Sequence, residues 1–148
     1  LKDLELCYSP VFGTARDEVN LAALVGLNVL HGVFKQVHVN EVRGLVENQA
    51  CIIDVRGRDE FEAGHLIGAI NIPLGELRQR TAEMPKDRAV SLHCRTSQRS
   101  YNAIMALKGR GFDNIINISG SFLGISYFEY FTDVTTGREK IVTEYNFM

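Results

Sequence analysis

The chain has 148 residues, 45% of them hydrophobic, and a formal net charge of -2 at pH 7. This composition fits one domain with a short appendage and excludes wholesale disorder, and the balanced charge speaks against nucleic-acid and membrane partners. The three cysteines, Cys7, Cys51 and Cys94, are too widely spaced for a disulfide framework or a close pair of metal ligands. We therefore expect a reducing, cytoplasmic setting and no metal.

Residues 1–32 differ in pattern from the rest of the chain. A loop at 8–13 precedes a predicted helix from Val19 to Leu30 that is apolar on nearly every side. Such a helix needs burial against a large surface. Two surfaces could bury this helix: a partner that is absent from this chain, or the neighbouring domain.

From Val33 onward, short apolar runs alternate with helical patterns. The predicted strands lie at 37–39, 51–55, 69–73, 89–93 and 114–118. The predicted helices lie at 40–47, 59–63, 74–83, 97–108 and 121–130. This alternation predicts an α/β fold, a mostly parallel sheet with helices on both faces, in a domain that we place at 33–131. Residues 132–148, with a predicted turn at Thr136-Gly137 between two extended pieces, are an extension of unknown role.

The stretch AVSLHCRTSQRS, residues 89–100, places a cysteine directly after a predicted strand. Ligands of α/β proteins bind beyond the carboxyl ends of the strands, and the free N–H groups at the start of the next helix favour an anion. Arg95 and Arg99 add positive charge, so we predict that Cys94 has a lowered pKa and acts as a nucleophile. The alternative, a buried and unreactive cysteine, suits Cys51 in its apolar strand better.

His93 precedes the cysteine and invites a catalytic Cys–His pair. Adjacent residues of a strand point to opposite faces of the sheet. We therefore predict a structural or peripheral role for His93 and no role as a base.

A second stretch, residues 54–73, reads DVRGRDEFEAGHLIGAINIP. Together with the cysteine loop it resembles the rhodanese family of sulfurtransferases, with only Leu66 departing from the family pattern, over roughly Val37 to Phe128. The resemblance implies a rhodanese-like fold and a persulfide carried on Cys94. It implies a cradle for that sulfur made of Arg95, Thr96, Ser97, Gln98 and Arg99. Three further matches are expected to tie the strand ends and the loop together: Asp54, Arg56 and His65.

The cysteine loop departs from similar loops at Ser97, where they usually carry glycine. Serine is strained in backbone conformations that glycine accepts, so the preferred sulfur donor stays open. Related phosphatases and arsenate reductases carry arginine six positions after the cysteine, where this chain has Ser100, and the shorter loop favours one sulfur atom over a phosphate. A rhodanese-fold module that binds or regulates without catalysis is the other alternative, and a cysteine kept in a charged loop favours the enzyme.

Residues 3–30, DLELCYSPVFGTARDEVNLAALVGLNVL, resemble the last part of the dimerisation domain of FAD-dependent pyridine nucleotide-disulfide oxidoreductases, above all the coenzyme A-disulfide reductase group. In that family the region matching Tyr8 lies near the flavin site of the partner subunit. We interpret residues 1–32 as a remnant of such a domain, and the chain as the sulfur-handling part of a larger disulfide, persulfide or polysulfide reductase. The chain lacks a Gly-x-Gly-x-x-Gly motif, so FAD, NAD(P)H and coenzyme A are implied only for the parent protein. Its expected partners are small sulfur donors, thiol acceptors, the missing flavoprotein domain and a second copy of the chain.

Overall fold

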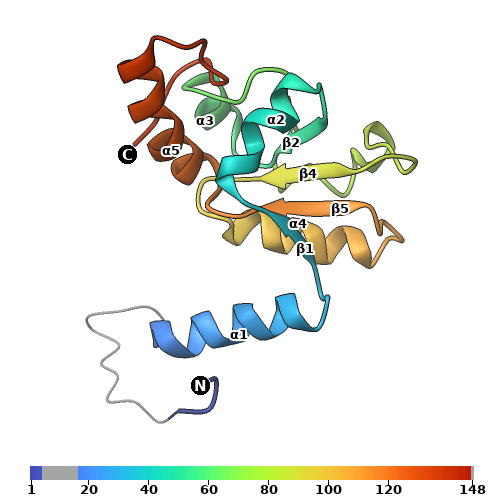
Figure 1. Ribbon diagram of the computed structural model, residues 1–148. Helices are drawn as coiled ribbons and strands as arrows, with labels where there is room; N and C mark the ends of the chain where they lie inside the picture. Colours follow the sequence, from blue (N-terminus) through green and yellow to red (C-terminus); the bar gives the residue numbers. More distant parts are fainter. Residues whose placement is uncertain (5–16, 148) are drawn as a thin grey trace. The chain divides into compact units, whose positions relative to one another are not determined.

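The computed structural model describes residues 1–4 and 17–147 (Figure 1). It divides into two compact units, Leu1–Lys35 and Gln36–Met148. The predictions for the loop at 8–13, which includes Tyr8, and for Cys7 fall on residues outside the described ranges. Within those ranges, no helix combines the length and the hydrophobicity that crossing a membrane requires.

The first unit contains helix α1, Glu18–Leu30, in agreement with the helix predicted there. Asp17 caps its start, because the carboxylate accepts a hydrogen bond of 2.8 Å from the backbone N–H of Val19. At its end, the N–H of His31 donates a hydrogen bond of 2.9 Å to the carbonyl of Leu27. The interpretation of this unit as a flavoprotein remnant stays a prediction.

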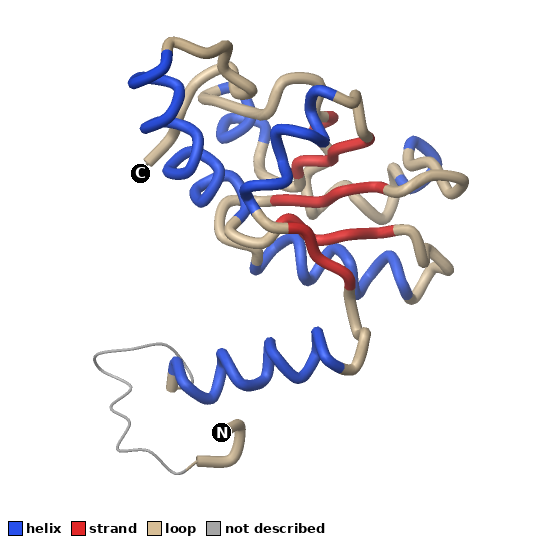
Figure 2. Tube along the Cα trace, viewed as in Figure 1, coloured by secondary structure: helices blue, strands red, loops and turns tan. Residues whose placement is uncertain are grey.

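The second unit is built on a five-stranded sheet with the strand order β1-β5-β4-β2-β3 (Figure 2). The strands are β1 Lys35–Val37, β2 Cys51–Asp54, β3 Ile70–Asn71, β4 Val90–His93 and β5 Ile115–Ile118. Strand β2 pairs in parallel with both β3 and β4, and β4 pairs in parallel with β5. The register aligns Asp54 with Asn71 on one side and with His93 on the other. The carboxyl ends of three neighbouring strands therefore meet at one edge of the sheet.

Helices cover both faces of the sheet, as predicted. They are α2 Val42–Glu47, α3 Arg58–Glu62, α4 Gln98–Lys108 and α5 Ser121–Thr136, with short 3-10 turns η1 Val39–Glu41 and η2 Thr81–Glu83. Helix α4 lies on one face, and α2 and α5 lie on the other (Figure 1). On the α2 and α5 side, Val42, Phe122 and Ile125 pack with Ile52 and Ile118 of the strands in one buried cluster. The strands are apolar on both faces because both faces are covered.

The segment 74–83, predicted to be a helix, instead forms successive turns that end in η2. Leu77 is the only fully buried side chain of this segment. A single apolar anchor gives a helix no face to pack against the sheet. Arg80 holds the turns together through Glu76 and Glu83 and through the carbonyl of Asn71.

Helix α5 runs to Thr136, six residues beyond its predicted end, and Gly137 at φ 66° terminates it. The chain then returns to the sheet domain, where Val142 forms an antiparallel bridge with Leu66. Ile141 and Val142 are 3% and 2% exposed, so this segment contributes to the core. The prediction of two extended pieces around a turn at Thr136 is therefore wrong.

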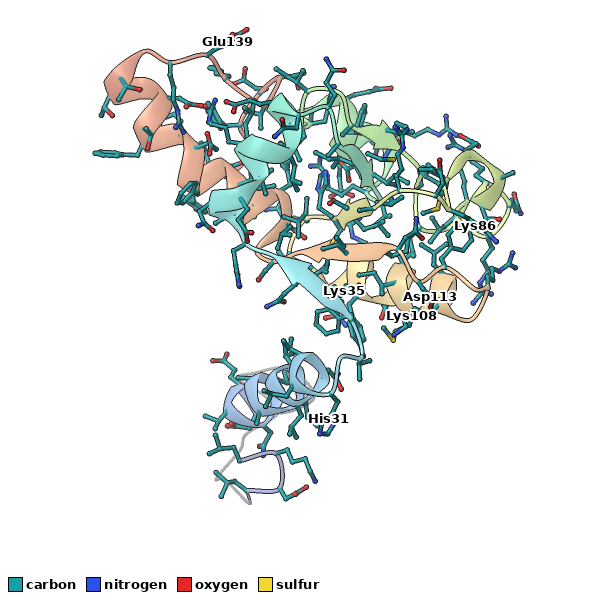
Figure 3. The ribbon with its side chains drawn as sticks, turned by 45° about the vertical axis from the view of Figure 1, so that its right-hand side comes forward. His31, Lys35, Lys86, Lys108, Asp113 and Glu139 are labelled. Atoms are coloured by element: carbon teal, nitrogen blue, oxygen red, sulfur yellow. The ribbon has the colours of Figure 1, made fainter. Side chains whose placement is uncertain are left out.

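The buried side of α5 carries two carboxylates, Glu129 and Asp133. Arg43 of α2 donates to Glu129 and to Asp133, and Arg138 from the loop after α5 does the same. The guanidinium of Arg43 also donates to the carbonyl of Glu139, which lies in the loop after α5 (Figure 3). Polar residues on an inward helix face hide the helical pattern from the sequence.

Candidate active site

Cys94 directly follows β4 and is only 1% exposed. The start of α5 fixes the loop that begins there, since the N–H of Phe122 donates to the Cys94 carbonyl at 3.0 Å. The N–H of Leu123 donates to the Arg95 carbonyl at 3.1 Å. The loop is therefore held from two sides, by the strand that delivers it and by the helix that follows the next strand.

The surroundings of the Cys94 thiol favour its anion. Burial alone would raise the pKa of this thiol, but hydrogen bonds outweigh burial and hold the pKa below its ordinary value. The donors are the backbone N–H groups of Ser100, Thr96 and Arg99, with the Ser100 hydroxyl as a further contributor. These donors lie in the loop before α4 and in the first turn of that helix, where free N–H groups favour an anion.

Arg99 is bound mainly to Glu60 of α3, through two hydrogen bonds of 2.6 and 2.7 Å. The hydrogen bond from Arg99 lowers the pKa of Glu60 to about 2 despite partial burial. Hydrogen bonding to Glu60 raises the pKa of Arg99, and the charge of Cys94 adds to that rise. The arginine therefore links the cysteine loop to α3, and backbone N–H groups supply most of the stabilisation of the thiolate.

The remaining residues of the predicted cradle differ in their exposure and in their backbone conformation. Arg95 is half-buried, and its carbonyl accepts the hydrogen bond from the N–H of Leu123 in α5. The side chains of Thr96 and Gln98 are exposed. Ser97 has φ 77° and ψ -11°, the left-handed conformation that its replacement of glycine implies. Its hydroxyl donates to the Ile118 carbonyl at 3.2 Å, which ties the strained residue to the end of β5.

Asp54 and Arg56 form a buried ion pair at the end of β2, with exposed fractions of 0% and 1%. The guanidinium of Arg56 also donates to the Gly64 carbonyl at 2.7 Å and lies 4.0 Å from the centre of the Phe122 ring. Because the Phe122 N–H holds the Cys94 carbonyl, this pair supports the loop through α5. A buried guanidinium with a carboxylate, a carbonyl and an aromatic face has its charge and its hydrogen bonds satisfied.

The two histidines near these motifs have separate surroundings. His93 is fully buried, and its Nδ1 lies 3.2 Å from the Cys94 carbonyl oxygen. Burial lowers the pKa of His93, although the nearby charge of Asp54 acts in the opposite direction. His65 stacks on Phe61 of α3 and places Nδ1 2.8 Å from the Phe61 carbonyl, while its backbone pairs with Thr143 of the C-terminal segment.

The structure thus gathers Cys94 and the loop residues 95–99 at the end of β4, and the ion pair of Asp54 and Arg56 lies at the end of the neighbouring strand β2. His65 belongs to the contact between α3 and the C-terminal segment. Sequence reasoning assigned no role to three residues of this site, namely Glu60, Ser100 and Ser121. Glu60 stands in the quoted stretch 54–73 and Ser100 in the quoted stretch 89–100, so their nearness to the two motifs was the available signal. Ser121 had no signal, because only the fold brings it to the cysteine.

The profile of the rhodanese-like domain family matches residues 38–127, more than half of the chain. The chain therefore belongs to the rhodanese-like domain family. It is 46% identical over 74 residues to the uncharacterised protein YqhL of Bacillus subtilis, covering 50% of this chain and 59% of that protein. It is 32% identical over 72 residues to a sulfurtransferase of Allochromatium vinosum, covering 49% and 67% of the two chains.

Two solved structures resemble a larger share of the chain. One is reduced CoADR-RHD of Bacillus anthracis, with 38% identity and a TM-score of 0.76, covering 82% of this chain and 22% of that one. The other is an NAD-dependent persulfide reductase from A. fulgidus, with 33% identity and a TM-score of 0.70, covering 82% and 21%. The chain thus corresponds to about a fifth of each of these two longer proteins.

Proposed function

We propose that this chain is a sulfurtransferase that carries sulfur as a persulfide on Cys94. The observation that carries the proposal is a buried thiol at a strand end whose pKa is lowered by backbone N–H donors. A thiolate is the nucleophilic form of cysteine, and donors that stabilise it stabilise a persulfide anion in the same way. The sulfurtransferase among the relatives supports the same chemistry.

In the proposed first step, the Cys94 thiolate attacks the outer sulfur of a donor such as thiosulfate. A new S–S bond forms to Cys94, the S–S bond of thiosulfate breaks, and sulfite leaves with the electron pair of the broken bond. In the second step, a thiolate or cyanide attacks the outer sulfur of the persulfide, which regenerates the Cys94 thiolate. The acceptor leaves as a persulfide or as thiocyanate, so sulfur is passed on without net oxidation.

We further propose that the chain is the sulfur-handling part of a longer cytoplasmic reductase. The two long structural relatives, one of them an NAD-dependent persulfide reductase, support this arrangement. The persulfide that leaves Cys94 on an acceptor such as coenzyme A would be reduced by NAD(P)H to the thiol and hydrogen sulfide. FAD, NAD(P)H and coenzyme A belong to the proposed parent protein, and residues 1–32 to its dimerisation domain.

The experiment compares Cys94→Ser with Cys51→Ser in the conversion of thiosulfate and cyanide to thiocyanate. Cys51 is also free and buried, but burial raises the pKa of its thiol, so it is the matched control. We expect Cys94→Ser to abolish the reaction with the fold intact, and Cys51→Ser to retain it. Transfer that persists in Cys94→Ser would refute the proposal.

The rival function is a rhodanese-fold module that binds or regulates without catalysis. Alkylation with iodoacetamide at pH 7 separates the two functions, because only the enzyme needs a reactive thiolate. We expect Cys94 to react at least about tenfold faster than Cys51, since their pKa values shift in opposite directions. Equally slow reaction of both thiols would favour the binding module.

A further inference from the structure

Two serines beside the nucleophile adopt backbone angles that serine rarely adopts. Ser97 has φ 77° and Ser121 has φ 49°, both in the left-handed region that favours glycine. Gln49 at φ 52° is the third such non-glycine residue among those that the structure describes, and it lies after α2. Strained backbone of this kind is concentrated at functional sites. Two serines in glycine-like conformations at one cysteine therefore point to a use for their hydroxyl groups.

The Ser121 hydroxyl faces Cys94 from the start of α5. Its Oγ accepts a hydrogen bond of 3.2 Å from the Cys94 N–H and lies 4.0 Å from Sγ with the geometry of a donor. Ser121 is completely buried, so water does not compete for this hydroxyl. A hydroxyl has a single proton, which Ser121 can give to only one acceptor at a time.

The competing acceptors of that proton are the Ile118 carbonyl at 3.3 Å and the Ser97 hydroxyl at 3.1 Å. Ser97 reaches the same Ile118 carbonyl at 3.2 Å. When Ser97 instead donates to the Ser121 Oγ, that oxygen accepts two hydrogen bonds, from Ser97 and from the Cys94 N–H, and Ser97 no longer accepts the Ser121 proton. The Ser121 proton is then left for the sulfur or for the Ile118 carbonyl. A sulfur anion attracts that proton more strongly than a neutral oxygen does.

We propose that Ser121 donates a hydrogen bond to the sulfur anion of Cys94, and that Ser97 is a positioning residue that releases the Ser121 proton for it. The inference deepens the proposed function, on which it rests for the persulfide, and applies equally to the bare thiolate. The other donors come from the loop before α4 and from the first turn of that helix. Ser121 adds a donor from a separate helix, so the anion is held from two elements of the fold.

The test measures the rate of Cys94 alkylation by iodoacetamide against pH in the purified chain, with peptide mapping by mass spectrometry. Ser121→Gly removes the hydroxyl and allows the observed φ without strain. We expect the midpoint of its rate–pH curve to move upward and the rate at pH 6 to fall about threefold, because an anion that loses a donor has a higher pKa. Ser97→Gly should cause a smaller change in the same direction. The double variant should match Ser121→Gly alone, because Ser97 acts through Ser121.

Gln49→Gly is the matched control, since it relieves the same kind of backbone angle outside the site and should leave the curve unchanged. An unchanged midpoint in Ser121→Gly would overturn the inference, and fully additive effects of the two serines would overturn the positioning role of Ser97. If Ser121→Gly does not fold, the direction of the Ser97→Gly change decides. Alkylation needs no sulfur donor, so a shifted curve in a chain without sulfur transfer refutes the proposed function and keeps this inference.

Discussion

At Cys94 two physical effects oppose each other, and the direction of the pKa shift shows which one is larger. A thiol with 1% of its surface exposed loses the hydration that would stabilise its anion. Three backbone N–H groups replace that hydration, and they are fixed in place because α4 begins there. The fold therefore supplies a preorganised anion site at Cys94, and the His93 ring lies with Nδ1 3.2 Å from the Cys94 carbonyl oxygen.

The Glu60–Arg99 pair predicts a pH-dependent contribution to stability. The pKa of Glu60 is about 2 in the folded chain, below its unfolded value, so the pair stabilises the fold above pH 4.5 and loses this effect as pH falls toward 2. We expect Glu60→Gln to lower the free energy of unfolding by about 1 kcal/mol at pH 7, since the pair is partly exposed. Urea unfolding at several pH values measures the difference.

The matched control for that prediction is Glu62→Gln, an exposed residue of the same helix. Its effect should be smaller at pH 7 and should show no comparable decrease on acidification. A Glu60→Gln effect that stays constant from pH 7 to pH 3 would show that the ionised carboxylate contributes nothing to the pair.

The sequence was sufficient to predict the lowered pKa of the Cys94 thiol and backbone strain at Ser97, because both follow from a short continuous stretch. The sequence was insufficient to predict which distant residues contact the cysteine loop. Glu60 lies 39 residues from Arg99 in the chain, and Ser121 lies 27 residues from Cys94. Only the parallel pairing of strands brings such residues together, and a single sequence carries no record of that contact.

At the scale of elements, α5 has an inverted distribution of polarity. Glu129 and Asp133 point inward to two arginines, whereas Tyr127 and Phe131 are 62% and 72% exposed. The helix is therefore stabilised by buried ion pairs and not by an apolar stripe alone. This is why its sequence predicts a shorter helix than the structure contains.

Glu129→Ala should be strongly destabilising. It removes a buried acceptor from both Arg43 and Arg138, and a buried ionic group that loses its partner costs about 3 kcal/mol. Urea unfolding measures the loss. The control is Glu139→Ala, which changes an exposed side chain after the same helix. This control should change the free energy of unfolding by no more than about 0.5 kcal/mol. A change of less than about 1 kcal/mol in Glu129→Ala would mean that the cluster is dispensable.

Gly64, after α3, lies where the C-terminal segment crosses the chain. A Cβ atom at this position would lie 2.5 Å from the Glu144 carbonyl oxygen, so the backbone of that segment would have to move. We expect Gly64→Ala to lower the free energy of unfolding by about 1–3 kcal/mol, as overpacking does. Thermal unfolding measures it as a lower midpoint.

Gly44→Ala is the control for this crossing, because a Cβ at Gly44 in helix α2 meets no atom within 4 Å. Alanine in a helix should leave the midpoint unchanged or raise it. An unchanged midpoint in Gly64→Ala would show that the C-terminal segment is not packed against Gly64.

The order of strands and helices was predictable from periodicity alone, and the parallel sheet with two covered faces is confirmed. The errors lie where periodicity fails. At 74–83 the residues favour a helix, but the segment offers the core only Leu77. At Thr136-Gly137 the sequence favours a turn between extended pieces, but in the structure Gly137 ends helix α5.

At the scale of the whole molecule, the described residues form a family domain with a unit before it and a packed segment after it. The segment 137–147 belongs to the domain physically, because Ile141 and Val142 complete its core. This chain covers about a fifth of the length of each of the two long structural relatives. In the proposed parent, sulfur collected at Cys94 is handed to a reductase on the same chain.

The most direct test of sulfur transfer through Cys94 is the intact mass of the chain after incubation with thiosulfate, and separately with polysulfide, followed by peptide mapping. We expect a gain of one sulfur atom on Cys94, which cyanide or reduced coenzyme A then removes. The better donor would indicate the pathway that the protein serves. No gain with either donor, in a folded chain whose Cys94 is free to be alkylated, would contradict sulfur transfer and favour a binding module.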